Sequence, residues 1–151
     1  MYKISILLPY KENFSPTYPG AVSLFVNSTS QISKYKKNII VYGFTELKKK
    51  FNLKYINIPL KKKIFQSASK EYVEKFVRLH ENNYSDIIEI HNRPNYVSLI
   101  SRLQSKIILY FHNDPLTMIG SKSSNERIYL LDKCSKIIFN SEWSKKRFLT
   151  K

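Results

Sequence analysis

Six short apolar runs, separated by segments with helical spacing, constrain the fold of this 151-residue chain more than any other feature. Several runs are continuous rather than alternating, which is typical of strands buried on both faces of a sheet. The runs are Ile4–Leu8, Ile39–Tyr42, Tyr55–Ile58, Ile87–Ile90, Ile107–Phe111 and Ile137–Phe139. Because strands and helices alternate, the sequence predicts an α/β fold with a doubly wound, mostly parallel sheet and helices on both faces.

Helical spacing and capping residues predict where the helices lie between these strands. Helices are expected over Ala21–Ile32, Phe65–Leu79, Pro94–Leu103, Ser123–Cys134 and Ser141–Phe148. Proline suits the first turn of the third of these helices. Ser123 and Glu126 form the S-x-x-E pattern of a capping box, and Ser141 can cap the last helix. His80 falls late in the second helix, where we expect a solvated side chain or one matched to the helix dipole.

Length, composition and missing motifs exclude several classes of protein. A chain of 151 residues, 42% of them hydrophobic, fits one domain with a real core. Its single cysteine, Cys134, excludes a disulfide scaffold and a cysteine-rich zinc module. The sequence has no apolar run that could span a membrane and no signal peptide at Met1–Pro9, so we expect a cytoplasmic protein. Dinucleotide-binding, P-loop and nucleophile-elbow motifs are missing from the sequence as well.

The chain is strongly basic, with 26 Lys and Arg residues against 11 Asp and Glu residues and a net charge of +15. Such a charge favours anionic partners: nucleic acid, acidic lipid headgroups or phosphorylated substrates. The composition, rich in Lys, Ile, Asn, Tyr and Phe, is also what an AT-rich coding sequence produces. Between Lys34 and Lys63 the only carboxylate is that of Glu46. We predict that the second and third strands form one sheet edge, so that these lysines share one side and face either solvent or an anionic membrane.

Polar residues follow four of the six predicted strands, at the edge where ligands of doubly wound sheets bind. These residues are Lys11 and Glu12 after the first strand, His91, Asn92 and Arg93 after the fourth, His112, Asn113 and Asp114 after the fifth, and Asn140 and Ser141 after the sixth. Structural roles compete for some of them, since His91 could pin the turn before Pro94, and Asp114 before Pro115 is a common turn opener. Gly20 is either an ordinary turn residue or a position where a helix N-terminus approaches a phosphate.

Three segments carry a resemblance to a known family: Pro19-Gly20-Ala21, Asp86–Pro94 with its HNRP sequence, and Phe111–Pro115 with its HNDP sequence. In this order, followed by Ile137–Trp143, they resemble the N-terminal domain of family 4 GT-B glycosyltransferases. The nearest likeness is to bacterial members that build lipopolysaccharide and other surface glycans. The resemblance covers nearly the whole chain, although many members have a Gly-Gly pair where this chain has Gly20-Ala21.

The resemblance implies that residues 1–151 form a single Rossmann-like, acceptor-side domain, the N-terminal half of a GT-B fold, without the C-terminal donor-binding domain. The intact enzyme would move a sugar, with retention, from a nucleotide-sugar to a glycan or lipid-linked acceptor, without metal or cofactor, whereas this chain alone would be inactive. The alternative is a basic α/β module that binds nucleic acid or anionic membrane without catalysis, nucleic acid being the less expected partner.

The resemblance also assigns roles to the residues at the strand ends. His112, near the donor sugar, would be catalytic. The donor phosphates would lie against Gly20, Ala21 and Ser141. The acceptor would contact Lys11, Glu12, His91, Asn92, Arg93, Asn113 and Asp114. Because acceptors of such enzymes are often lipid-linked, the cytoplasmic location is expected to include a peripheral position on the inner face of the membrane.

Overall fold

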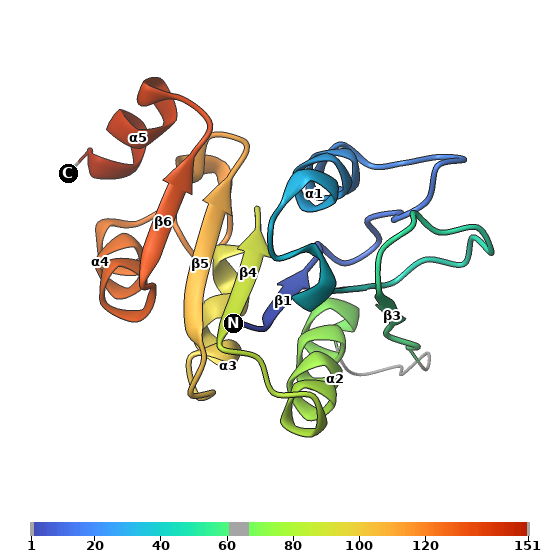
Figure 1. Ribbon diagram of the computed structural model, residues 1–151. Helices are drawn as coiled ribbons and strands as arrows, with labels where there is room; N and C mark the ends of the chain where they lie inside the picture. The colour runs from blue at the N-terminus through green and yellow to red at the C-terminus, as the bar shows by residue number, and fades with distance from the viewer. Residues whose placement is uncertain (1, 61–66, 151) are drawn as a thin grey trace.

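The computed structural model describes residues 2–60 and 67–150, in which a helix follows every strand except the second, which a loop joins directly to the third (Figure 1). The strands are β1 (Ile4–Leu7), β2 (Ile39–Gly43), β3 (Tyr55–Asn57), β4 (Ile87–His91), β5 (Lys106–Phe111) and β6 (Lys136–Phe139). The α-helices are α1 (Ala21–Ile32), α2 (Ala68–Asn82), α3 (Val97–Ile100), α4 (Ser124–Lys133) and α5 (Glu142–Leu149). Short 3-10 turns cover η1 (Lys36–Asn38), η2 (Pro94–Tyr96) and η3 (Pro115–Thr117).

The six strands form one sheet in the order β3-β2-β1-β4-β5-β6, and every neighbouring pair is parallel. This confirms the predicted fold class and the prediction that the second and third strands lie together at one edge. The chain order reverses between β1 and β4, so the carboxyl ends of these two strands form the switch point where ligands of such sheets bind.

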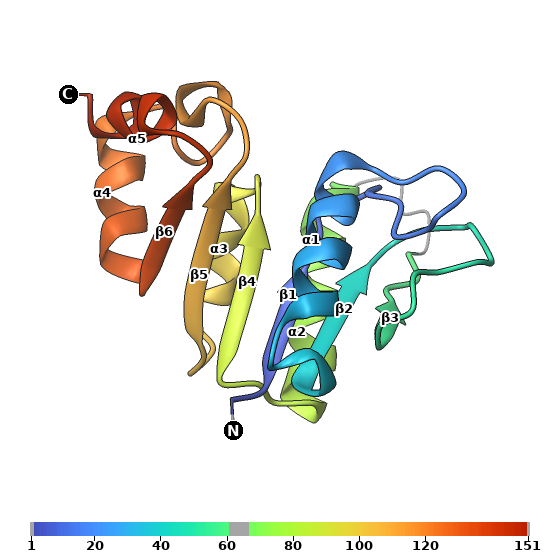
Figure 2. The same cartoon turned by 45° about the horizontal axis from the view of Figure 1, so that its top comes forward.

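Helices cover both faces of the sheet, and each face has its own core. Figure 2 shows α1 in front of β1 and β2, with α2 and α3 behind the sheet. Because side chains alternate along a strand, Ile4, Ile6 and Leu8 pack toward α1, while Leu7 packs toward α2 and α3. In Figure 2 no described helix covers the α1 side of β5. Side chains on that part of the sheet are therefore only partly buried, Ile108 and Tyr110 among them.

Local capping signals give correct helix starts. At α4, the Ser123 side chain accepts a hydrogen bond from the Glu126 backbone N–H, and the Glu126 carboxylate accepts one from the Ser123 N–H. This is the predicted capping box. The Ser141 hydroxyl accepts from the Ser144 N–H and caps α5, as predicted. Among residues 2–60 and 67–150, no helix combines the length and apolar character that a membrane span requires.

Two predictions about helices need correction. The helix expected over 94–103 is instead a 3-10 turn followed by the single turn of α3, which ends at Ile100. The prediction that His80 is solvated is wrong, because its side chain is only 1% exposed. The last turn of α2 faces the segments before β4 and β5, where His80 Nε2 lies 2.9 Å from Ser85 Oγ and 3.2 Å from Ser105 Oγ. The predicted start of α2 at Phe65 lies outside the described residues.

Candidate functional site

A cavity of about 300 Å³ opens at the carboxyl ends of β1, β4 and β5, beside the N-terminus of α1. Its lining residues are Pro9, Glu12, Ala21, Val22, Asn92, Arg93, His112 and Asn113. Six of these eight are residues that the sequence analysis assigned to a ligand. They come from segments up to about a hundred positions apart in the chain, and the parallel sheet brings them together at one point. We call this cavity the switch-point pocket.

Asn92 holds the base of the switch-point pocket together. Its backbone adopts a left-handed conformation with φ of 52°, which asparagine tolerates better than most residues. Its N–H donates to the Tyr110 carbonyl at 2.8 Å, and its side-chain Oδ1 accepts from the His112 N–H at 2.7 Å. The Arg93 guanidinium donates to the Asn92 carbonyl at 2.8 Å. Asn92 therefore joins the ends of β4 and β5 and fixes the position of the His112 backbone.

His112 is paired with His91 on the neighbouring strand. His91 Nδ1 lies 2.9 Å from His112 Nε2, and the two rings are stacked with an interplanar angle of 17°. The strand register places His91 beside Tyr110, whose ring stacks on the His91 ring at a centroid distance of 4.7 Å. On the other side of His91, its Nε2 lies 3.7 Å from Glu89 Oε2. Glu89, His91 and His112 thus form a line from the open sheet face into the switch-point pocket.

The surroundings of His112 keep its imidazole neutral. Burial, followed by the proximity of His91, lowers the pKa of His112 to about 4. The Phe25 ring of α1 packs edge-on against His112 at a centroid distance of 4.8 Å. The Asn140 amide donates to the His112 carbonyl at 2.7 Å. At neutral pH this side chain offers hydrogen bonds rather than positive charge to a ligand.

Gly20 is explained by the chain's own Glu12. An added Cβ at Gly20 would lie 1.9 Å from Glu12 Oε1, so a larger residue here would displace the Glu12 carboxylate. The Gly20 backbone itself is ordinary, with φ of −75° and ψ of 158°. Glu12 Oε1 accepts a hydrogen bond from the Ser23 N–H at 2.9 Å, which places a carboxylate at the positive end of α1. The phosphate role of Gly20 and Ala21 stays a prediction, and it requires Glu12 to move.

Three further predicted residues lie outside the lining of the switch-point pocket. Lys11 is exposed, with its Nζ 5.6 Å from the centre of the Tyr10 ring. Asp114 accepts from the Leu116 N–H and pairs with Arg147 at 3.0 Å, and hydrogen bonding to this guanidinium lowers the pKa of the Asp114 carboxyl. Ser141 caps α5. The turn-opening role of Asp114 is confirmed, while ligand contacts of these residues stay predictions.

Sequence reasoning missed Phe25, Glu89 and Tyr110 as neighbours of the histidines. All three contact His91 or lie within a few ångströms of it. Strand alternation carries a partial signal, because residues 89 and 91 of β4 share a face with residue 110 of β5 and residue 112 directly after it. The contact from Phe25 has no such signal, since it depends on how α1 lies across the sheet.

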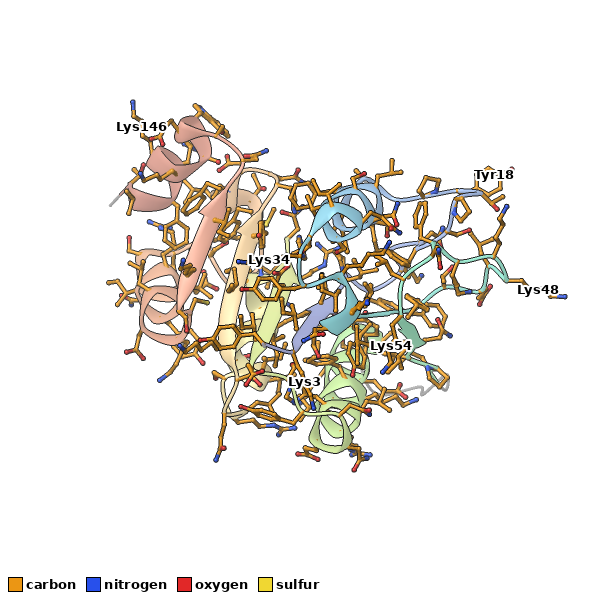
Figure 3. The ribbon with its side chains drawn as sticks, in the orientation of Figure 1. Lys3, Tyr18, Lys34, Lys48, Lys54 and Lys146 are labelled. Carbon is orange, nitrogen blue, oxygen red and sulfur yellow. The ribbon has the colours of Figure 1, made fainter. Side chains whose placement is uncertain are left out.

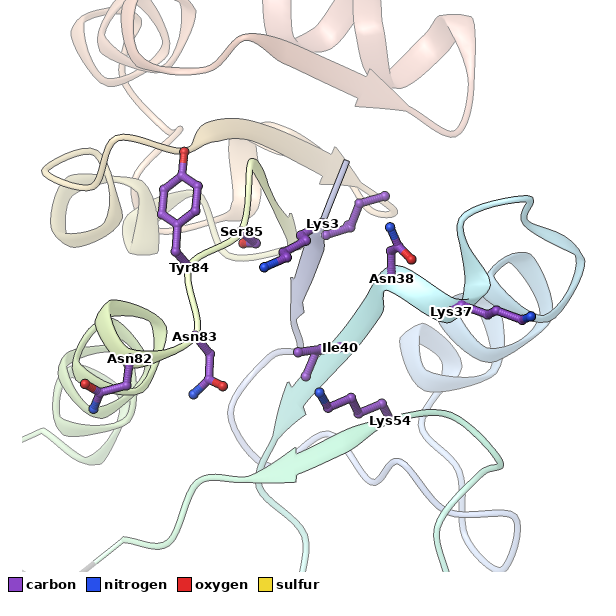
Figure 4. A pocket seen from close by; sticks show the side chains of 10 residues that line it. Lys3, Lys37, Asn38, Ile40, Lys54, Asn82, Asn83, Tyr84 and Ser85 are labelled. Atoms are coloured by element: carbon purple, nitrogen blue, oxygen red, sulfur yellow. The ribbon is translucent and has the colours of Figure 1, made fainter. Parts of the chain in front are cut away.

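A second cavity, of about 370 Å³, lies at the opposite, amino ends of the strands (Figure 4). Lys3, Lys37 and Lys54 contribute to its wall. The amide nitrogens of Asn82 and Asn83 already donate to the carbonyls of the last turn of α2. Within residues 2–60 and 67–150, no three His, Cys, Asp or Glu side chains lie together as a metal site would need.

A parallel sheet in this strand order, with helices on both faces and a polar pocket at its switch point, defines a Rossmann-like α/β domain. The chain is similar in fold to Anabaena Alr3699/HepE, whose crystal structure was determined in complex with UDP-glucose. The TM-score is 0.65 at 15% sequence identity, and the match covers 97% of this chain and 40% of that chain. No protein-family model matches the sequence, and no curated protein matches it.

Proposed function

We propose that this chain is the acceptor-side domain of a retaining glycosyltransferase, which moves a sugar from a nucleotide-sugar to a lipopolysaccharide or other surface-glycan acceptor. The observation that carries the proposal is the switch-point pocket, where Glu12, Asn92, Arg93, His112 and Asn113 converge. The fold shared with a protein crystallised with UDP-glucose supports a nucleotide-sugar as the donor. The proposal includes no metal or cofactor.

The residues of the pocket suit a hydroxyl-rich ligand. Glu12 offers carboxylate oxygens, His112 a neutral imidazole, and Asn113 an exposed amide that both donates and accepts. In the proposed reaction the nucleoside diphosphate leaves as its charge develops, and that charge has to be stabilised. We assign most of this stabilisation to a donor-binding domain outside these 151 residues. The Rossmann-like domain described here would hold the acceptor and contact the donor sugar.

The proposal predicts weak donor binding and no transfer by the 151-residue chain alone. Titration with UDP-glucose, followed by calorimetry and by NMR, is expected to give a Kd on the order of millimolar, because most donor contacts would be missing. The NMR chemical-shift changes should be largest at His112 and Asn113, and they should be smaller in Asn113→Ala. The matched control, Asn125→Ala, changes an exposed amide on α4 and should leave binding unchanged.

Two results would contradict this proposal. Micromolar affinity for the donor, or measurable sugar transfer by the isolated chain, would mean that the domain assignment is wrong. If no residue of the switch-point pocket shows a chemical-shift change, the pocket does not bind the substrate.

A second proposed function, docking to an anionic membrane, rests on the lysines around β2 and β3. Exposed lysines in this part of the chain are Lys34, Lys36, Lys37, Lys48, Lys49 and Lys54. Figure 3 labels Lys34, Lys48 and Lys54. Lys50 is turned inward, with its Nζ donating to the Leu47 carbonyl. Lys61, Lys62 and Lys63, which belong to the same predicted surface, lie outside the described residues. Each lysine near an anionic bilayer contributes about 1 kcal/mol.

Vesicle co-sedimentation tests the membrane proposal. Binding should rise with the anionic lipid fraction and fall when Lys36, Lys37, Lys48 and Lys49 are changed to Gln. Lys145 and Lys146 lie on α5, which follows the strand at the opposite sheet edge, and their change to Gln is the control. Equal binding to neutral and anionic vesicles would exclude this function.

A further inference from the structure

The buried His91 connects a carboxylate on the open sheet face to the imidazole that lines the switch-point pocket. Its side chain is 1% exposed, and both of its ring nitrogens face an ionisable neighbour. Nδ1 lies 2.9 Å from His112 Nε2, while Nε2 lies 3.7 Å from Glu89 Oε2. When both imidazoles are neutral, they share one proton between the facing nitrogens. The position of that proton therefore decides what His112 offers to a ligand.

The Glu89 carboxylate settles where the His91 proton lies. His91 Nε2 is buried and has no hydrogen-bond partner among the described residues. A bare Nε2 lone pair facing a carboxylate would be repelled, whereas an N–H in the same place is attracted. A neutral His91 therefore carries its proton on Nε2, and its Nδ1 is an acceptor. For the 2.9 Å contact to be a hydrogen bond, His112 Nε2 must be the donor.

We propose that Glu89 and His91 are positioning residues that hold His112 as the Nε2–H tautomer, with the lone pair of Nδ1 exposed in the switch-point pocket. No described residue forms a hydrogen bond with His112 Nδ1, and this atom is not among the buried atoms that lack a partner. Nδ1 is thus open to a ligand. A group that binds there has to donate a hydrogen bond, as a sugar hydroxyl does and a fully ionised phosphate oxygen does not.

The packing around the three residues supports a fixed geometry. Tyr110 stacks on His91 with an interplanar angle of 13°, and Phe25 packs edge-on against both histidines. These rings hold the two imidazoles in register. The Glu89 side chain is 20% exposed, and a small rotation of its carboxylate would close the 3.7 Å gap to a hydrogen bond. Burial and the nearby Glu89 charge raise the pKa of Tyr110 to about 12, so this phenol stays neutral beside the pair.

The tautomers can be measured directly in this chain by NMR of ¹⁵N-labelled imidazoles at neutral pH. We expect His112 and His91 to carry their protons on Nε2. His80 is the internal reference, because the Ser85 N–H donates to its Nε2 at 3.2 Å and a neutral His80 must carry its proton on Nδ1. Glu89→Gln removes the charge, and both His91 and His112 should then shift together toward the Nδ1–H form.

Glu142→Gln is the matched control, since this exposed carboxylate contacts only Lys145 at 3.8 Å among described residues and should leave both tautomers unchanged. A proton on Nδ1 of His112 in the wild-type chain would overturn the proposal, and this spectrum needs no variant to fold. An unchanged His112 signal in folded Glu89→Gln would overturn it as well.

Ligand titration separates this inference from the proposed function. Only the choice of a sugar as the ligand rests on the proposed function. Methyl glucoside should shift the His112 Nδ1 signal, whereas inorganic sulfate, which carries no proton at neutral pH, should not at the same concentration. If the tautomers are as expected and the glucoside has no effect, the positioning role of Glu89 stands and the sugar-binding function fails. If sulfate alone shifts the Nδ1 signal, the exposed atom is a donor and the positioning proposal fails.

Discussion

Replacement of Gly20 by alanine tests whether Glu12 and Gly20 act as a pair at the start of α1. The backbone angles of Gly20 suit alanine, so the substitution adds no backbone strain. The new Cβ would meet Glu12 Oε1 at 1.9 Å and Glu12 Cδ at 2.3 Å. Because the carboxylate is the end of a flexible side chain, it will swing away. The steric cost is therefore small, and the lost interaction determines the effect.

The magnitude of the effect follows from the interactions that the Glu12 carboxylate loses when it moves away from the start of α1. Loss of a capping hydrogen bond at a helix N-terminus costs about 0.5–2 kcal/mol, to which the loss of a negative charge at the positive helix end contributes. Alanine in place of glycine returns about 0.4–1 kcal/mol, because the unfolded chain loses conformational freedom. We expect Gly20→Ala to lower the free energy of unfolding by about 1 kcal/mol net. For a chain of this length that lowers Tm by about 2–4 °C.

A double-mutant cycle with Glu12→Ala provides the decisive comparison. Urea unfolding followed by circular dichroism gives the free energy of unfolding of the wild type, both single variants and the double variant. In the Glu12→Ala background, Gly20→Ala should be neutral or slightly stabilising, since no carboxylate is left to displace. Ser28→Ala, an exposed change on α1, is the control. If Gly20→Ala costs the same with and without Glu12, the two residues do not interact and our account of Gly20 is wrong.

Three further predictions follow from the same contacts. In the proposed glycosyltransferase, His112→Ala should lower turnover far more than it lowers Tm, and near-normal transfer rates would remove His112 from the site. The pKa of His112 is about 4 in the folded chain against an ordinary value of 6.5, so the unfolded chain takes up the proton first as the pH falls. The wild type should therefore lose stability relative to His112→Gln between about pH 6.5 and pH 4. Urea midpoints of both proteins at pH 7 and pH 5 measure this difference. His80→Ala leaves two buried serine hydroxyls without their imidazole partner and should cost about 2–4 kcal/mol in urea unfolding, a value that a surface histidine would not reach.

Local patterns in the sequence determined the architecture and much of the pocket. The continuous apolar runs predicted all six strands, and Ser123 with Glu126 marked the start of α4. Polar residues at the strand ends predicted five of the eight residues that line the switch-point pocket, and the family resemblance added Ala21. Such predictions succeed because strand burial, helix caps and the ligand-binding edge of a parallel sheet depend on residue type and short spacing.

Only the tertiary structure decided what these residues do to one another. His80 is buried because the end of α2 meets the segments before β4 and β5, and the space beside Gly20 is filled because Glu12 reaches across the loop to α1. The line from Glu89 through His91 to His112 depends on the register between β4 and β5, which aligns residues some twenty positions apart. Spacing along the chain does not encode such distances, because they arise from packing between elements that are remote in sequence.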